Sequence, residues 1–217
     1  MMTTDYTGTT LPAVPTWLAD FIQELKLGFN INSGPFLAGG AVRRTMKWYL
    51  ENYPVPVASA PIPPDFDIFC KNAKQHEDVC QYLLDVGAEL QTTNERHHNF
   101  TIEEKGWKIQ VVKQRFYYDA VSLLDSFDFR ICRFAADSSG FIIFDKLALE
   151  DLKTNRLVTV NIENPISSFV RLIKYSKQGF QMSGEDLVEF MHQCQIRLDK
   201  LSPVDWESYI HTTLGAP

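Results

Sequence analysis

Phe-Leu-Ala-Gly-Gly-Ala-Val-Arg-Arg, residues 36–44, is the stretch that decides the fold. A short apolar run, residues 36–38, is followed at once by Gly39 and Gly40, and residues 41–50 continue in a helical pattern. The apolar run is typical of a buried strand, and two glycines permit a tight turn. The stretch therefore predicts a strand, a glycine turn and a helix.

A second motif, Asp65-Phe66-Asp67-Ile68, follows a loop at residues 53–64 that contains five of the 11 prolines. Its alternation of polar and apolar residues predicts a strand, and side chains two apart on a strand lie on the same face. Two carboxylates on one face repel each other unless a cation lies between them. Hard oxygen ligands favour Mg²⁺ or Mn²⁺.

The two motifs together match what phosphoryl transfer requires, which is a pocket for a triphosphate and carboxylates that hold a metal ion. Glycines at a helix N-terminus let backbone N–H groups approach a phosphate closely. Either motif alone is typical of a tight turn or of a solvated strand edge, so the prediction depends on their order. We expect Gly39, Gly40 and Arg43 to bind a nucleoside triphosphate, and Asp65 and Asp67 to be the catalytic, metal-binding pair.

The rest of the chain mixes helices and strands up to about residue 160 and is helical afterwards. Residues 1–11 show no apolar period and are expected to form a loose arm. Further strands are expected at 99–102, 107–112, 127–132 and 140–144, and further helices at 15–28, 76–86, 119–124, 147–152, 165–179 and 185–198. The predicted fold class is α+β, with a catalytic head of mixed β-sheet flanked by helices at 1–160 and a small helical tail at 161–217.

Composition limits the function classes. The 217 residues are 45% hydrophobic, which is enough for a real core, and the net charge of -6 excludes a surface that is basic throughout, although a local basic patch remains compatible. The four cysteines form no CxxC pair, so neither zinc binding nor disulfides are expected. The chain shows no signal peptide or long apolar run, which predicts a cytoplasmic protein without a membrane partner.

These motifs resemble those of the polymerase-β superfamily of nucleotidyltransferases, in particular the bacterial-type CCA-adding enzymes and poly(A) polymerases. Residues 37–43 are similar to the family's GGxVR opening, and residues 65–68 are similar to its DxD strand. Residues 127–137 resemble its second motif, with Asp128 on the motif aspartate, and residues 164–180 resemble its following helix.

The resemblance implies a Mg²⁺- or Mn²⁺-dependent enzyme that moves a nucleoside monophosphate from a triphosphate such as ATP to a hydroxyl acceptor and releases pyrophosphate. It implies that Asp128 and Arg130 contact the nucleotide and that Arg171 and Lys174 lie near phosphate or primer. An RNA 3′ end is one candidate acceptor, and a protein side chain or a small molecule are the others.

Three departures from the family pattern favour an alternative. Arg44 stands where the family has Asp, Ser126-Phe127 replaces a pair of arginines, and Gln110 lies where the wider superfamily often has a third acidic residue. The alternative is a catalytically degenerate head that works as a binding module through a protein partner. A minimal accessory or toxin-like transferase of a mobile element is a third candidate.

Two other candidates are assigned structural roles. The adjacent His97 and His98 are interpreted as part of a polar hairpin loop, because adjacent histidines project in different directions. Cys132 is interpreted as a small buried side chain.

Overall fold

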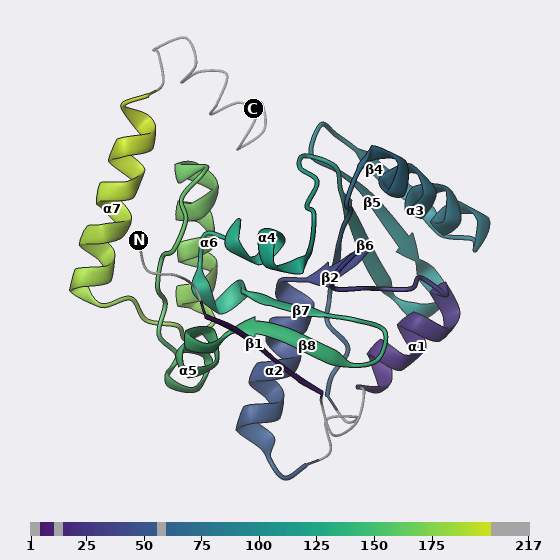
Figure 1. The fold of residues 1–217 in the computed structure, drawn as a ribbon, viewed down its shortest axis with the longest axis horizontal. Coiled ribbons are helices and arrows are strands. Elements are labelled where there is room, and N and C mark those ends of the chain that lie inside the picture. Colours follow the sequence, from purple (N-terminus) through teal and green to yellow (C-terminus); the bar gives the residue numbers. More distant parts are fainter. Residues whose placement is uncertain (1–4, 11–14, 56–59, 201–217) are drawn as a thin grey trace.

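The computed structural model describes residues 5–10, 15–55 and 60–200. Its centre is one mixed eight-stranded sheet of order β1-β8-β7-β2-β3-β6-β5-β4 (Figure 1). Only the β3–β6 pair is parallel among the strand pairs of this sheet. The strands are β1 (Tyr6–Thr10), β2 (Phe36–Ala38), β3 (Phe66–Phe69), β4 (Glu89–Thr93), β5 (His97–Ile102), β6 (Trp107–Val112), β7 (Phe134–Ala136) and β8 (Phe141–Asp145).

Helices pack against both faces of the sheet. The helices are α1 (Thr16–Leu25), α2 (Gly40–Asn52), α3 (Ala73–Asp85), α4 (Ala120–Asp125), α5 (Lys146–Thr154), α6 (Pro165–Lys177) and α7 (Gly184–Leu198). In Figure 1, α6 and α7 lie together on the left, and Phe169 of α6 contacts Phe190 of α7 with ring centroids 6.4 Å apart.

The strands bury different side chains on their two faces. Phe66 and Ile68 of β3 point into the larger core, which also contains side chains of α1, α2, α3 and α5. Phe69 points to the opposite face and packs with Leu123 and Leu124 of α4 in a smaller cluster. Because side chains alternate along a strand, Asp67 must lie on this second face. We call it the α4 face of the sheet, and the other the α3 face.

Side chains cap the starts of several helices. The Asp119 side chain accepts a hydrogen bond from the Ser122 N–H in a capping box, and the side chains of Asn72, Asn164 and Ser183 accept a backbone N–H at the starts of α3, α6 and α7. The α+β fold class, the strand-turn-helix at residues 36–52 and the hairpin of β5 and β6 are confirmed.

Several expectations about elements were wrong. The supposed loose arm contains β1, which pairs with β8 from Tyr6↔Asp145 to Thr10↔Phe141. Strand β4 was not expected. His97 and His98, interpreted as part of a hairpin loop, begin strand β5, and residues 127–132 end in a short 3-10 helix instead of forming a strand. Strand β7 follows that helix. The prediction of a helical tail lies partly outside the described residues, as do parts of the arm and of the proline-rich loop, and the boundary at residue 160 stays a prediction.

Among the described residues, no helix combines the length and the apolar character needed to cross a bilayer.

Candidate functional site

Asp65 and Asp67 lie beside the glycine turn. Asp67 stands opposite Ala38, the last residue of β2, in the β2–β3 register, and Asp65 immediately precedes β3. A Cβ atom added to Gly39 would lie 3.6 Å from Asp67 Oδ2, and one added to Gly40 would lie 3.9 Å from Asp65 Oδ1. The two motifs predicted to act together are therefore neighbours at one end of two adjacent strands.

The turn itself depends on Gly39. Its φ of 77° and ψ of -129° lie in a region that is almost closed to other residues. The Gly39 N–H donates to the Phe134 carbonyl oxygen at 3.1 Å, which ties the turn to β7. Gly40 then begins α2, so the positive end of the helix dipole lies next to both carboxylates.

These residues line a cleft of about 810 Å³ on the α4 face. Six basic side chains line it against four acidic ones, whereas the whole chain has 21 basic and 27 acidic residues. The basic residues are Arg43, Arg44, Arg96, Arg115, Arg171 and Lys174, and the acidic residues are Asp65, Asp67, Asp128 and Glu163. The cleft thus concentrates positive charge in an acidic protein, as an anion site requires.

The Asp67 carboxylate is in an unfavourable position when it is ionised. Burial and the neighbouring charge of Asp65 together raise its pKa to about 6, while Lys174 and Arg44 act in the opposite direction. A carboxylate that is costly to ionise, next to a second carboxylate, fits a site that gains free energy by binding a cation. The residues present therefore fit a hard divalent ion.

Arg44 supplies part of the positive charge that the two carboxylates need. Its Nη1 lies 2.7 Å from Asp65 Oδ1, and both side chains are partly exposed. The residue that departs from the family pattern thus forms an ion pair with one of the predicted metal ligands. An ion at this position would compete with the guanidinium for Asp65.

Arg43 lines the cleft but is only 2% exposed. Its guanidinium lies over the rings of Tyr175 and Phe180, and its Nη2 donates to Gln178 Oε1 at 2.9 Å. Arg43 therefore joins α2 to the end of α6. Its predicted contact with a triphosphate stays a prediction.

Asp128 and Arg171 form a bonded group on the wall of the cleft. Asp128 is 6% exposed, and its Oδ2 accepts hydrogen bonds from Ser168 Oγ at 2.9 Å and from Arg171 Nη1 at 2.7 Å. Lys174, one turn further along α6, also lines the cleft. The structure thus brings the second motif and the predicted phosphate-contacting residues to the same site as Asp65 and Asp67.

Arg130 is the exception among the predicted site residues. Its guanidinium makes two hydrogen bonds to the carboxylate of Asp151, at 2.7 and 3.1 Å, and it lines a separate pocket beside α5. The reason is the 3-10 helix at residues 130–132, which replaces the expected strand and turns Arg130 away from Asp128. A nucleotide in the main cleft would not contact Arg130 in this arrangement.

Gln110 stands directly beside Asp67 in the parallel β3–β6 register. Its Nε2 donates to Asn99 Oδ1 at 3.0 Å. An amide therefore occupies the place next to the aspartate pair where the wider superfamily often has a third acidic group. The structure also adds Arg96 and Tyr117 to the cleft, residues to which sequence analysis gave no role and which carry no motif.

Comparison with known proteins gives the family. Residues 14–155 match the family described as "Gabija anti-defense 2 family protein". The chain belongs to this family. A curated relative, "Gabija anti-defense 2" of Bacillus phage SPbetaL7, is 23% identical over 135 residues, which are 60% of this chain and 32% of the relative. The chain thus matches about a third of the length of that relative.

Solved structures give the fold. The Thermotoga maritima CCA-adding enzyme complexed with tRNA superimposes with a TM-score of 0.55 at 15% identity, over 93% of this chain and 46% of the enzyme. The Bacillus stearothermophilus CCA-adding enzyme in complex with CTP gives 0.54 at 20% identity, over 94% and 50%. This family member therefore has the nucleotidyltransferase head fold of CCA-adding enzymes, and it spans about half of their length.

Proposed function

We propose that this protein is a metal-dependent nucleotidyltransferase that moves a nucleoside monophosphate from a triphosphate to a hydroxyl acceptor, with release of pyrophosphate. One observation carries the proposal. Asp65 and Asp67 lie beside the Gly39–Gly40 turn in a cleft that concentrates basic side chains. The fold shared with CCA-adding enzymes supports it.

Each residue has a role in this proposal. Asp65 and Asp67 hold Mg²⁺ or Mn²⁺, and the bound ion supplies positive charge to the triphosphate oxygens and to the attacking hydroxyl. The glycine turn lets phosphate oxygens approach the backbone at the start of α2. Lys174 attracts the triphosphate, while Asp128 fixes Arg171 on the cleft wall through their 2.7 Å ion pair.

The acceptor is a hydroxyl group on RNA, on a protein side chain or on a small molecule. The family name points to the biological setting, and we propose that the protein acts against the defence system for which the family is named. A component of that system is then the first acceptor to test.

A second candidate function rests on two specific observations. The Arg44–Asp65 ion pair supplies a cation at the metal position, and Gln110 stands beside Asp67 in place of an acid. Both are expected of a head that has lost transfer chemistry and uses the same cleft to bind a nucleotide or a partner.

The test is incubation of the purified protein with each α-labelled nucleoside triphosphate, Mg²⁺ or Mn²⁺, and either total RNA or a lysate that contains the defence system. Transfer of label to a macromolecule or a small product in the wild type, and its loss in Asp65→Asn and Asp67→Asn, is the expected result. Asp20→Asn, an exposed aspartate on α1, is the matched control and should keep full transfer.

Binding measurements separate the two candidates. If the triphosphate raises the midpoint of thermal unfolding but no label is transferred to any pool, the protein is a binding module. If neither metal nor triphosphate at millimolar concentration shifts the midpoint, the cleft is not a nucleotide site, the transferase proposal fails, and the second candidate is left only as a module that binds a protein partner.

A further inference from the structure

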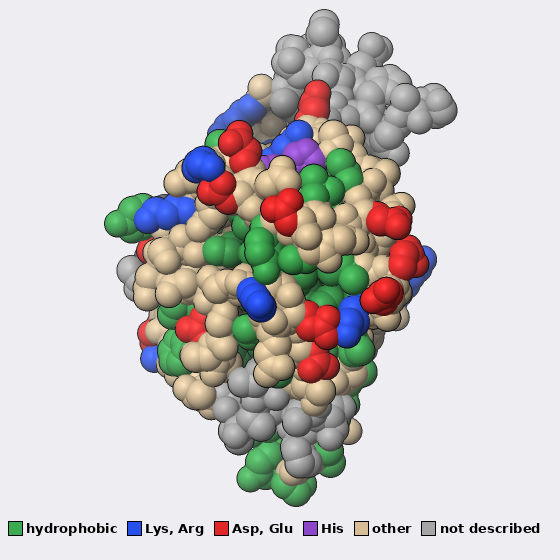
Figure 2. Space-filling model, turned by 90° about the vertical axis from the view of Figure 1, so that its right-hand side faces the viewer, with side chains coloured by type: hydrophobic (Ala, Val, Ile, Leu, Met, Phe, Trp, Pro, Cys, Tyr) green, Lys and Arg blue, Asp and Glu red, His purple; other side chains and the backbone are tan. Residues whose placement is uncertain are grey.

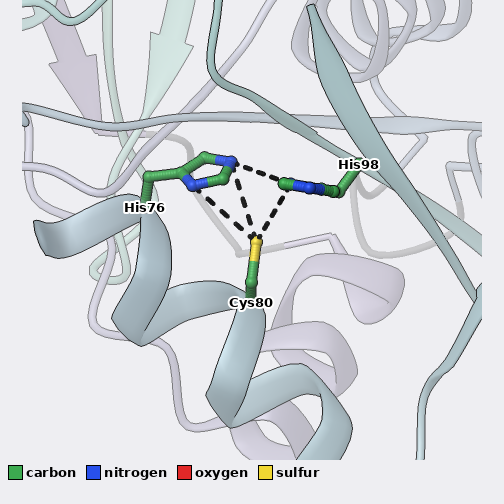
Figure 3. Close-up of side chains that lie close together, drawn as sticks. All are labelled: His76, Cys80 and His98. Atoms are coloured by element: carbon green, nitrogen blue, oxygen red, sulfur yellow. Dashed lines mark hydrogen bonds between the residues drawn. The ribbon is translucent and has the colours of Figure 1, made fainter. Parts of the chain in front are cut away.

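Three metal-binding side chains converge on the α3 face of the sheet, away from the cleft. His76 and Cys80 are four residues apart on α3, so they lie on the same side of that helix, and His98 reaches them from β5 (Figure 3). Their nitrogen and sulfur atoms all lie within 4.8 Å of one another. No other group of three such residues was found in the described part of the chain.

The separations between these atoms match tetrahedral zinc. Cys80 Sγ lies 3.7 Å from His76 Nε2 and 3.6 Å from His98 Nδ1, and the two nitrogens are 3.2 Å apart. Typical Zn–S and Zn–N bonds at tetrahedral angles place sulfur and nitrogen about 3.6 Å apart and two nitrogens about 3.3 Å apart. The three distances between these ligand atoms therefore fit a single zinc ion with little movement of the side chains.

The surroundings hold the ligands in place. The ring of His76 is 6% exposed and interacts with the backbone of Val111 on β6. Cys80 and His98 are only partly buried, so solvent reaches the cluster. Burial raises the pKa of the Cys80 thiol to about 11, and the charge of nearby Lys113 only partly opposes this, so zinc must displace the thiol proton when it binds.

We propose that His76 Nε2, Cys80 Sγ and His98 Nδ1 bind one Zn²⁺ ion, with a water molecule in the fourth position. Two imidazoles and a thiolate are ligands that suit zinc, and they differ from the all-oxygen set that Asp65 and Asp67 offer to Mg²⁺. The ion fastens α3 to the β5 strand of the sheet. It is a second metal site, on the opposite face of the sheet from the cleft.

The two sites share one strand. His97 precedes His98 on β5 and lines the cleft, because adjacent residues of a strand point to opposite faces. Zinc that holds His98 therefore also limits the movement of the cleft wall next to Gln110. The zinc site does not depend on nucleotide transfer, and its test uses no activity measurement.

The test begins with metal content and affinity. Reduced wild-type protein, freed of metal with a chelator and titrated with Zn²⁺, should bind one zinc per chain and show a higher midpoint of thermal unfolding. Co²⁺ in place of zinc should give the intense visible bands of tetrahedral coordination and a thiolate-to-cobalt charge-transfer band. Cys80→Ser and His98→Gln should each weaken zinc binding by more than about 100-fold.

Cys194→Ser is the matched control, because Cys80 and Cys194 are the two partly exposed cysteines while Cys70 and Cys132 are buried. This variant should bind zinc like the wild type. Thiol alkylation needs no substitution, and zinc should protect Cys80 but not Cys194 in the wild type. The proposal is overturned if the wild type binds no zinc at micromolar concentration, if Cys80→Ser keeps wild-type affinity, or if zinc leaves the alkylation of Cys80 unchanged.

Discussion

Asp67 links the stability of this protein to pH. Its folded-state pKa of about 6 lies above the ordinary value of 3.8, because burial and Asp65 disfavour the charged form. The folded state therefore holds a proton that the unfolded state releases between about pH 4 and pH 6, and stability falls as the pH rises through that window. Above about pH 6, the ionised Asp67 carboxylate lowers the free energy of unfolding, and a bound cation offsets this loss.

Asp67→Asn should remove this cost. In chelator, we expect the variant to be more stable than the wild type at about pH 7.5, by on the order of 2 kcal/mol. The advantage should shrink as the pH falls through 6 toward 4, because the folded-state carboxyl becomes protonated and the unfolded-state carboxyl begins to follow. Thermal or urea unfolding at about pH 7.5 and about pH 4.5 measures this, and an equal difference at both pH values would contradict it.

Arg44→Ala should expose Asp65 to metal. The ion pair with Asp65 is partly exposed, so we expect its removal to strengthen Mn²⁺ binding by no more than about fivefold, equivalent to about 1 kcal/mol. Metal titration in the absence of nucleotide isolates this effect from the loss of a positive charge near the triphosphate. Weaker Mn²⁺ binding in the variant would show that Arg44 supports the metal instead of competing with it.

Single residues differed in how well the sequence predicted them. The common position of Asp65 and Asp67 in one cleft was predictable from their spacing, and their metal-binding role stays a prediction. Arg130 was not, because its orientation depends on a 3-10 helix and on Asp151, 21 residues away. The cluster of His76, Cys80 and His98 was also missed, because it needs the packing of α3 against β5, which no local spacing reveals.

At the scale of elements, the β2–turn–α2 unit holds the site together. Gly39 is in a glycine-only conformation, while Gly40 has a helical one, so the two glycines serve different purposes. The Cβ of an alanine would make only ordinary contacts at either position, at 3.6 Å or more. Any difference between the two substitutions must therefore come from the backbone.

We expect Gly39→Ala to lower stability by about 1–3 kcal/mol and to disturb the turn beside Asp67. Gly40→Ala should instead leave stability unchanged or raise it by up to about 1 kcal/mol, because alanine favours the helix. Chemical unfolding of the two variants side by side provides the comparison. Equal losses would mean that the conformation of the turn is not what requires glycine.

Elements with local signals were predicted well and elements without them were not. The capped helices and the β5–β6 hairpin carry their own start and stop residues. Strand β1 has no such signal, and its partner β8 lies more than a hundred residues away in the sequence. Residues 127–132 alternate as a strand would, but backbone hydrogen bonds from Cys132 to Phe129 and from Arg133 to Arg130 form a 3-10 helix instead.

At the scale of the whole molecule, charge is distributed unevenly. The cleft has a basic excess, although the chain is acidic overall. On the side of the molecule that carries α1 and α3, Figure 2 shows acidic and basic side chains interspersed around apolar groups, with no continuous basic tract. This face therefore offers no second basic surface for an anion.

Binding of inorganic tripolyphosphate should weaken as NaCl rises from about 0.05 to about 0.3 M, since salt screens the charges of the cleft. Lys174→Gln should lower affinity by about fivefold and flatten the salt dependence. Lys177→Gln, on the same helix but not lining the cleft, is the matched control and should behave like the wild type. Equal effects of the two variants would place the anion outside the cleft.

Strand β1 has a consequence for how the chain is made. Its partners on β8 follow it by 131 residues at Thr10↔Phe141 and by 139 at Tyr6↔Asp145. At ordinary rates of translation the first strand leaves the ribosome roughly 7 to 26 s before a partner exists for it. The β1–β8 edge therefore forms only after more than a hundred further residues are made, and until then the nascent chain carries an unpaired strand that chaperones or a neighbouring chain can bind.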